Sequence, residues 1–79
     1  MLVYDLQDIV GDSLIYSYQV EGREQDVGSI SIDTSSGVTE VVDLAPNDDF
    51  RWYAHHLMRR LEGMYADNDF KDHGLVMWY

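Results

Sequence analysis

The sequence contains no cysteine, a single proline and only five lysine or arginine residues among 79. Without cysteine, no disulfide can support the fold. A domain of this length buries only about 60% of the surface that its unfolded chain exposes, so its stability margin is small. Small domains without disulfides depend on metals, close packing or self-association. We expect one domain over residues 1–79 that is stabilised by packing or by self-association.

Long apolar segments are also missing. A transmembrane helix needs a run of about 18 or more apolar residues, and the sequence has none. The N-terminus lacks the basic segment and apolar core that are typical of a signal peptide. These absences predict no membrane contact and a cytoplasmic protein, and the lack of cysteine is consistent with a reducing compartment.

Positive charge is scarce, since fifteen acidic residues and five basic ones give a net charge of −10. Binding to a nucleic-acid backbone requires a basic surface, so we expect no direct nucleic-acid binding. The acidic residues are spread over turns and element ends. They serve solubility, or they form a surface that attracts a basic partner or imitates nucleic acid.

The motifs of common enzymes and metal sites are absent. Neither the GxGxxG nor the Walker A pattern occurs. His55 and His56 are adjacent and would point about 100° apart on a helix, and no histidine pair has the i, i+4 spacing of a helical zinc site. Residues 67–74 lack the sixth-position glycine and the twelfth-position glutamate of an EF-hand. We therefore predict no enzymatic activity, no cofactor and no metal site.

The strongest pattern that is present is an amphipathic helix, predicted over residues 47–65. Its apolar residues recur at spacings of four, three, four and three, which marks one helical face. Those residues are Phe50, Ala54, Leu57, Leu61 and Met64. Tyr53 and Met58 fall on the flanks of this stripe, and Tyr65 extends it.

Charged and polar residues mark the two ends of this helix. Asn47, Asp48 and Asp49 can accept hydrogen bonds from free N–H groups of the first turn. Arg59 and Arg60 lie in the later turns, where positive charge is favoured. Gly63 weakens the helix, and residues 67–69 end it.

Three segments before the helix predict strands, because aromatic and β-branched residues alternate with polar ones. They cover residues 13–20, 26–33 and 38–44, and two short polar connections join them into an antiparallel meander. Residues 1–10 fit a strand, a helix or a coil. The apolar run 75–79 predicts a final strand, which we expect beside 13–20 or 38–44.

The two faces of this sheet differ. Tyr16, Tyr18, Ile30 and Ile32 form an apolar face, whereas the opposite face is small and polar. One helix covers one face, so the sequence predicts an α+β two-layer sandwich with an open second face. Its element order is β-β-β-α-β, with a three-stranded antiparallel meander, one amphipathic helix and a C-terminal strand.

Trp52 does not fit the apolar stripe, because it projects from the polar side of the predicted helix beside His56 and Arg59. It stacks on one of these neighbours, it is covered by residues 1–10, or it anchors an interface, where tryptophan and arginine are favoured. We identify Trp52, His56, Arg59 and Arg60 as a candidate interface.

These observations favour a small acidic, non-enzymatic protein–protein interaction domain whose partner is a second copy or another protein. Two alternatives stay open. The first is an acidic inhibitor, or nucleic-acid mimic, that binds a basic partner. The second is a small-ligand or metal-binding protein that uses His55, His56 and residues 67–73.

Overall fold

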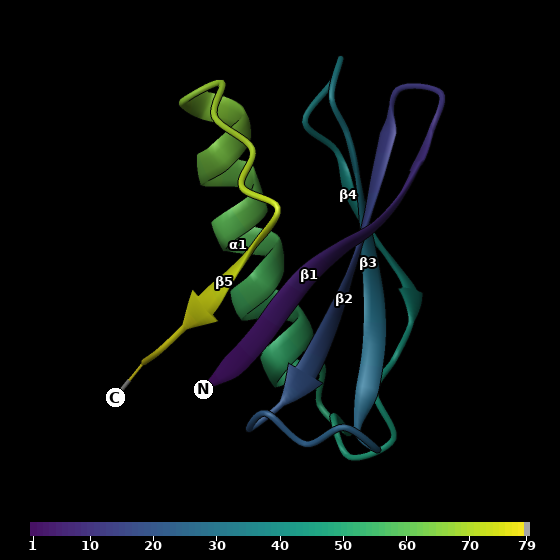
Figure 1. Cartoon of the computed structure of the whole chain (residues 1–79), viewed down its shortest axis with the longest axis vertical. Helices are drawn as coiled ribbons and strands as arrows, with labels where there is room; N and C mark the ends of the chain where they lie inside the picture. Colours follow the sequence, from purple (N-terminus) through teal and green to yellow (C-terminus); the bar gives the residue numbers. More distant parts are fainter. Residues whose placement is uncertain (79) are drawn as a thin grey trace.

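A computed structural model describes residues 1–78 and shows a five-stranded antiparallel sheet with one helix on one of its faces (Figure 1). The strand order is β4-β3-β2-β1-β5. The elements in chain order are β1 (Leu2–Val10), β2 (Ser13–Val20), β3 (Val27–Asp33), β4 (Thr39–Asp43), α1 (Trp52–Ala66) and β5 (His73–Val76). The predicted α+β two-layer sandwich with an open second face is confirmed.

Within the first ten residues, whose sequence fitted three structures, Leu2–Val10 form β1. This strand pairs with β2 from Leu2↔Val20 onwards and places Leu2 and Tyr4 on the buried face. The chain therefore enters the meander one strand earlier than the sequence predicts. A ten-residue pattern could not separate a strand from a helix, and the pairing with β2 decides between them.

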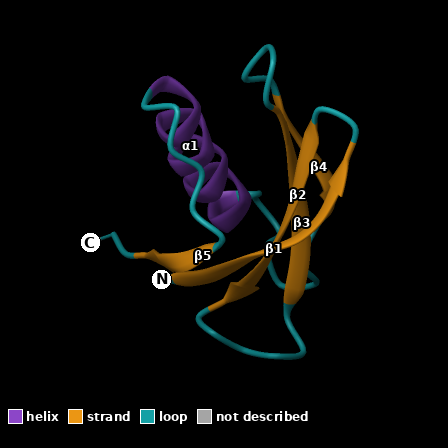
Figure 2. Cartoon of the chain, turned by 45° about the horizontal axis from the view of Figure 1, so that its top comes forward, coloured by secondary structure: helices purple, strands orange, loops and turns teal. Residues whose placement is uncertain are grey.

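The final strand lies beside β1, so its predicted place beside 13–20 or 38–44 is wrong. Since β1 and β3 pair with the two sides of β2, residues 13–20 have no free edge. Helix α1 crosses behind the sheet and delivers the chain to the β1 side (Figures 1 and 2). Tyr16 fixes this return, because its hydroxyl donates to Lys71 O at 2.8 Å. Burial, then the nearby Tyr4 and Asp72, raises the pKa of Tyr16 to about 12, so the hydroxyl stays a donor.

The predicted strand 75–79 differs in its bounds. Pairing with β1 runs from His73 to Val76, and Met77 and Trp78 leave the sheet. Tyr79, the last residue of the predicted strand, lies outside the described residues.

The helix begins later than predicted, at Trp52 rather than near residue 47. Phe50 is 87% exposed and does not belong to the apolar stripe. The reason is a turn before the helix, in which Arg51 N donates to Asp48 O at 3.0 Å and Arg51 takes a left-handed φ of 57°. The remaining stripe is confirmed, since the helical residues buried against the sheet are Ala54, Leu57, Leu61 and Met64.

The other end of the helix agrees with the sequence. Gly63 does not interrupt it, and α1 ends at Ala66, directly before the predicted stop at 67–69. Tyr65 is 37% exposed and packs over Gly37 at the rim of the core. The contact is close, since a Cβ atom added at Gly37 would lie 2.7 Å from the Tyr65 ring. Among the described residues, no helix is long and apolar enough to cross a bilayer.

Asp48 joins the helix to the sheet. Its carboxylate is 1% exposed and accepts hydrogen bonds from the backbone N–H groups of Tyr53 and Ala54, at 3.0 and 2.9 Å. The hydroxyl of Tyr18 in β2 donates to the same carboxylate at 3.0 Å and accepts a bond from Ala45 N at 3.1 Å. The expected side-chain cap is therefore provided by Asp48, three residues ahead of Arg51, the residue that directly precedes the helix.

A row of four cross-strand partners underlies this connection. In register order across the sheet they are Gly74, Tyr4, Tyr18 and Gly28. Each tyrosine ring covers the glycine of the neighbouring strand. An added Cβ at Gly28 would overlap the Tyr18 ring and lie 2.6 Å from Ala45 N. Glycine is therefore needed at this position for close approach.

We predict that Gly28→Ala destabilises the protein by about 1–3 kcal/mol, because the new methyl group displaces Tyr18 from Asp48. Urea denaturation followed by circular dichroism measures this change. Gly63→Ala is the matched control, because no atom lies within 4 Å of its Cβ position. This helical substitution should raise stability by about 0.5–1 kcal/mol. Equal effects of the two variants would contradict the packing assigned to Gly28.

Candidate protein interface

Four aromatic side chains from the helix and the C-terminal segment form one cluster, which we call the aromatic cluster: Trp52, Tyr53, His56 and Trp78. The imidazole of His56 stacks on Trp78 with ring centroids 3.8 Å apart and planes inclined by 10°. Trp78 meets Tyr53 edge to face at 5.2 Å. Trp52 contacts His56 at 6.1 Å, also edge to face. The cluster therefore connects the N-terminal half of α1 to the end of β5.

The predicted interface residue Trp52 is 61% exposed, whereas the other three members of the cluster are half-buried. Cover by residues 1–10 is excluded, since these residues form β1 within the sheet. Local stacking accounts for one edge of the ring, through His56. Most of the indole surface still faces solvent, although burial of aromatic area is strongly favourable.

Trp78 is the member of the cluster that the sequence did not predict. The sequence predicts that Trp78 lies within the strand 75–79, whereas in the structure it follows β5 and stacks on His56. Residues two apart in a strand share a face, so Val76 and Trp78 both fall on the helix side. This alternation would have placed Trp78 near the helix if the position of the strand had been known.

The arginines of the predicted interface lie beside the aromatic cluster. A hollow of about 400 Å³ is lined by Trp52, His55, His56, Met58, Arg59 and Glu62. Arg59 also lines a second hollow of about 390 Å³, together with Arg60 and Lys71. Within residues 1–78, the ion pairs involve neither Arg59 nor Arg60. Both guanidinium groups are exposed, and the carboxylates of Glu62, Asp67 and Asp69 line the same two hollows.

The histidines of the ligand-binding alternative are not brought together. His55 and His56 project from α1, whereas His73 is the register partner of Asp5 in β5. Residue partners in a sheet share a face, and Asp5 lies on the face away from the helix. Among residues 1–78, no three histidine or acidic side chains are placed to hold a metal ion.

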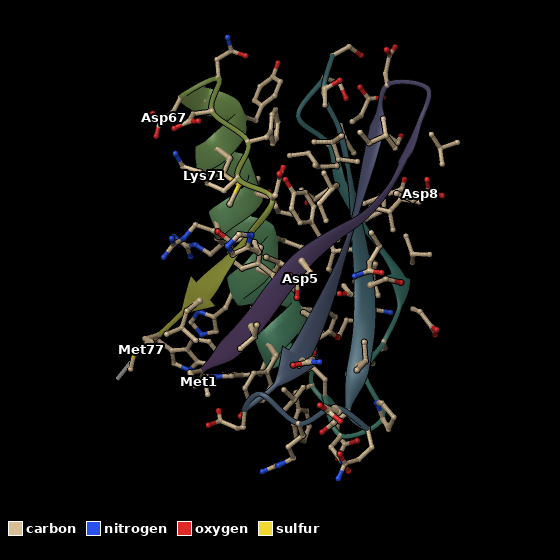
Figure 3. The ribbon with its side chains drawn as sticks, in the orientation of Figure 1. Met1, Asp5, Asp8, Asp67, Lys71 and Met77 are labelled. Carbon is tan, nitrogen blue, oxygen red and sulfur yellow. The ribbon has the colours of Figure 1, made fainter. Side chains whose placement is uncertain are left out.

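The open face of the sheet carries an arrangement of carboxylates that the sequence did not predict. One register row runs Asp5, Ser17, Ser29, Asp43, and the next runs Asp8, Ile15, Ser31, Glu40. The four carboxylates at the corners form what we call the acidic rectangle: Asp5, Asp8, Glu40 and Asp43. Neighbouring strands are about 4.8 Å apart and alternate residues about 7 Å, so the rectangle measures roughly 14 by 7 Å. Figure 3 shows Asp5 and Asp8 in succession along β1.

Two β-bulges create this rectangle. Asp5 and Asp8 are three residues apart, as are Glu40 and Asp43, and in regular strands each pair would point to opposite faces. The register shifts in β1 between Leu6 and Asp8, and in β4 opposite Ser29 and Ile30. Each shift inserts one residue and brings both carboxylates to the open face. A pattern of strict alternation cannot reveal such an inserted residue.

Other acidic residues have structural roles. Asp26 is 1% exposed and accepts bonds from the backbone and side-chain nitrogens of Asn47. Asp33 accepts bonds from Ser35 and Ser36 in the β3–β4 turn, and these bonds lower the pKa of its carboxyl group. The acidic side chains are thus divided between turns, the helix side and the acidic rectangle.

Comparison with protein families, characterised proteins and solved structures finds no match.

We predict that His56 makes stability depend on pH around neutrality. Burial of the imidazole, and then the nearby Arg59, lowers the pKa of His56 from its ordinary 6.5. Between the lowered and the ordinary value the unfolded chain binds the additional proton, so the free energy of unfolding should fall as the pH drops through 6.5. Below the lowered pKa this loss is complete.

Urea denaturation at several pH values between 8 and 5 tests this expectation. His56→Gln should remove the fall in the free energy of unfolding below pH 6.5. His55→Gln, which changes a neighbouring exposed residue, should retain it. Parallel pH profiles for the wild type and the His56→Gln variant would show that the stacked imidazole does not act in this way.

Proposed function

We propose that this chain is a small protein–protein interaction domain without catalytic activity, and that it forms a homodimer through the surface around Trp52. The observation that carries this proposal is the 61% exposure of Trp52 within a cluster whose other rings stack on one another. Tryptophan and arginine are enriched among the residues that dominate binding energy at interfaces. Trp52, His56, Arg59 and Arg60 lie around the two adjoining hollows.

A second copy fits this surface for two physical reasons. A domain of 79 residues without disulfides has a thin core, and burial of further apolar area between copies adds stability. Two chains of net charge −10 also repel one another over most of their surface. On the side that carries Arg59 and Arg60, their positive charges offset part of this repulsion.

The proposal is tested by sedimentation over a wide range of protein concentration. The wild type should convert from monomer to dimer as the concentration rises. Trp52→Ala should weaken the dimer by about 30-fold or more, as expected for a residue that contributes 2 kcal/mol or more to binding. Ile9→Ala is the matched control, because Ile9 is 64% exposed but lies at the far end of β1.

Two results would contradict the homodimer. One is a wild-type protein that stays monomeric at the highest concentration. The other is an equal loss of association in the Trp52→Ala and Ile9→Ala variants, which would indicate nonspecific contact between apolar side chains.

The acidic rectangle supports a second candidate function, in which the open sheet face binds a basic surface such as a nucleic-acid-binding groove. Its spacing of about 7 Å along each strand resembles that of successive phosphates in a nucleic-acid chain, and potentials of opposite sign attract partners over long range. No basic residue is interposed in the two rows. Such a surface would act as an inhibitor of its basic partner.

We expect the double variant Asp8→Asn, Glu40→Gln to bind an arginine-rich peptide at least tenfold more weakly than the wild type. Fluorescence titration at 50 and 150 mM salt measures this change. The double variant Glu62→Gln, Asp67→Asn removes the same charge on the helix side and is the control. Similar losses in both variants would attribute the binding to net charge and would remove the acidic rectangle as its cause.

A further inference from the structure

The outer edge of β5 is unpaired in the structure of residues 1–78. β5 is the last strand in the sheet order, and its four residues pair with β1 on one side only. An unpaired edge presents a row of backbone N–H and C=O groups to which another strand can bond.

The register identifies which of these groups face outward. Leu6 N donates to Asp72 O across the β1–β5 pair, and Glu21 N donates to Met1 O across the β1–β2 pair. Bonded partners alternate along an antiparallel ladder. Gly74 and Val76 therefore bond to β1, and the backbone groups of His73 and Leu75 point away from the sheet.

The two edges of the sheet differ in their protection. β4 contains a bulge and carries Glu40 and Asp43, and both features discourage pairing with another strand. Residues 73–78 contain no lysine, proline or carboxylate, and the register of His73–Val76 with β1 has no bulge. Leu75 is 47% exposed and Met77 is 52% exposed on this edge.

We propose that two copies of the chain join β5 to β5 in an antiparallel pair about a twofold axis at Leu75, forming one continuous ten-stranded sheet. This inference rests on the homodimer proposed above and specifies its geometry. In this register Leu75 bonds to Leu75 of the second copy in both directions, and His73 lies opposite Met77 of the second copy, the residue that follows β5. The outward N–H and C=O groups of Leu75 then find partners within β5 of the second copy.

The side chains on the open face support the second copy as the occupant. Leu75 is the register partner of Val3, which lies next to Gln19 in β2. Pairing about Leu75 places two leucines side by side between two valines and closes an apolar strip across the axis. This strip is complementary to itself, as a twofold interface requires.

Charge complementarity also favours this register. Beyond the two ends of β5, the same twofold axis brings Asp72 of the second copy to the side where Trp78 follows β5. Asp72 is the bonded partner of Leu6, which packs against the core, so it lies on the helix face. Its carboxylate therefore approaches the aromatic cluster and the neighbouring Arg59, which lines the same hollow as Trp52 and His56, and the twofold axis repeats this approach.

The paired strands need the aromatic cluster to reach the size of a stable interface. Two short strands alone are marginal in water, and specific interfaces bury about 1,200–2,000 Å². Figure 3 shows Met77 at the outer end of β5, and His56 connects Trp52 to the same edge through Trp78. One twofold operation thus brings both the edge strand and the exposed Trp52 into a single interface.

Cysteine cross-linking tests the register, because the chain has no cysteine of its own. Bonded partners in an antiparallel pair have Cα atoms about 5.5 Å apart, within the range of a disulfide. Leu75→Cys should form a covalent dimer under mild oxidation at a concentration at which the wild type is dimeric. Val27→Cys, at the other end of the same row of the open face, should stay monomeric.

Leu75→Pro provides a second measurement. It removes an N–H that points away from β1, so the fold should be retained, as checked by circular dichroism, while sedimentation shows a monomer. If this variant does not fold, the Leu75→Cys cross-link decides. A dimer that survives Leu75→Pro, or a Leu75→Cys variant that cross-links no better than Val27→Cys, overturns edge pairing. If the dimer survives Leu75→Pro but is lost in Trp52→Ala, the proposed homodimer stands without the β5 contact. A wild-type protein that stays monomeric overturns both the homodimer and the edge pairing.

Discussion

The buried carboxylate of Asp48 is the contact on which the arrangement of the two layers depends. It accepts hydrogen bonds from Tyr53 N, Ala54 N and the Tyr18 hydroxyl, and it is 1% exposed. A buried carboxylate without such donors would be strongly destabilising, so the helix can start only where its free N–H groups reach this side chain. Burial foremost, with Asp48 contributing, raises the pKa of Tyr18 and keeps its hydroxyl protonated as a donor.

The start of the helix fixes the direction of every side chain that follows. With Trp52 as the first helical residue, Ala54, Leu57 and Leu61 face the sheet and are fully buried. Trp52 and His56 are then turned to the outer flank. The contact of Asp48 with the helix start therefore both stabilises the fold and turns Trp52 away from the sheet. A helix that began at residue 47, as the sequence predicted, would not have required the left-handed Arg51.

The candidate surfaces occupy different parts of the molecule. The acidic rectangle lies on the face away from the helix, and the aromatic cluster lies at the helix and the end of β5. A dimer that forms through β5 would leave both acidic rectangles free on one continuous sheet face. Self-association and binding of a basic partner are thus compatible in one protein, and separate sets of side chains would carry them.

Much of the fold could be predicted from residue patterns alone. The alternation in residues 13–20 and the spacing of Ala54, Leu57, Leu61 and Met64 predicted the layers, because burial of one face is a local and periodic requirement. The ends of elements were harder. Phe50 fitted the helical stripe, but the turn at Asp48 excludes it from the helix, and this turn depends on Tyr18, thirty residues earlier in the sequence.

The sequence by itself determined the two-layer α+β architecture, the apolar face of the sheet and the position of Trp52 outside the apolar stripe of the helix. The tertiary structure alone decided that residues 2–10 form a strand, that β5 lies beside β1 and that Trp78 covers His56. It also decided that two bulges gather four carboxylates on one face. The physical reason is that periodicity reports which face of an element is buried, whereas strand neighbours, bulges and contacts between distant segments depend on which partner is free to pair.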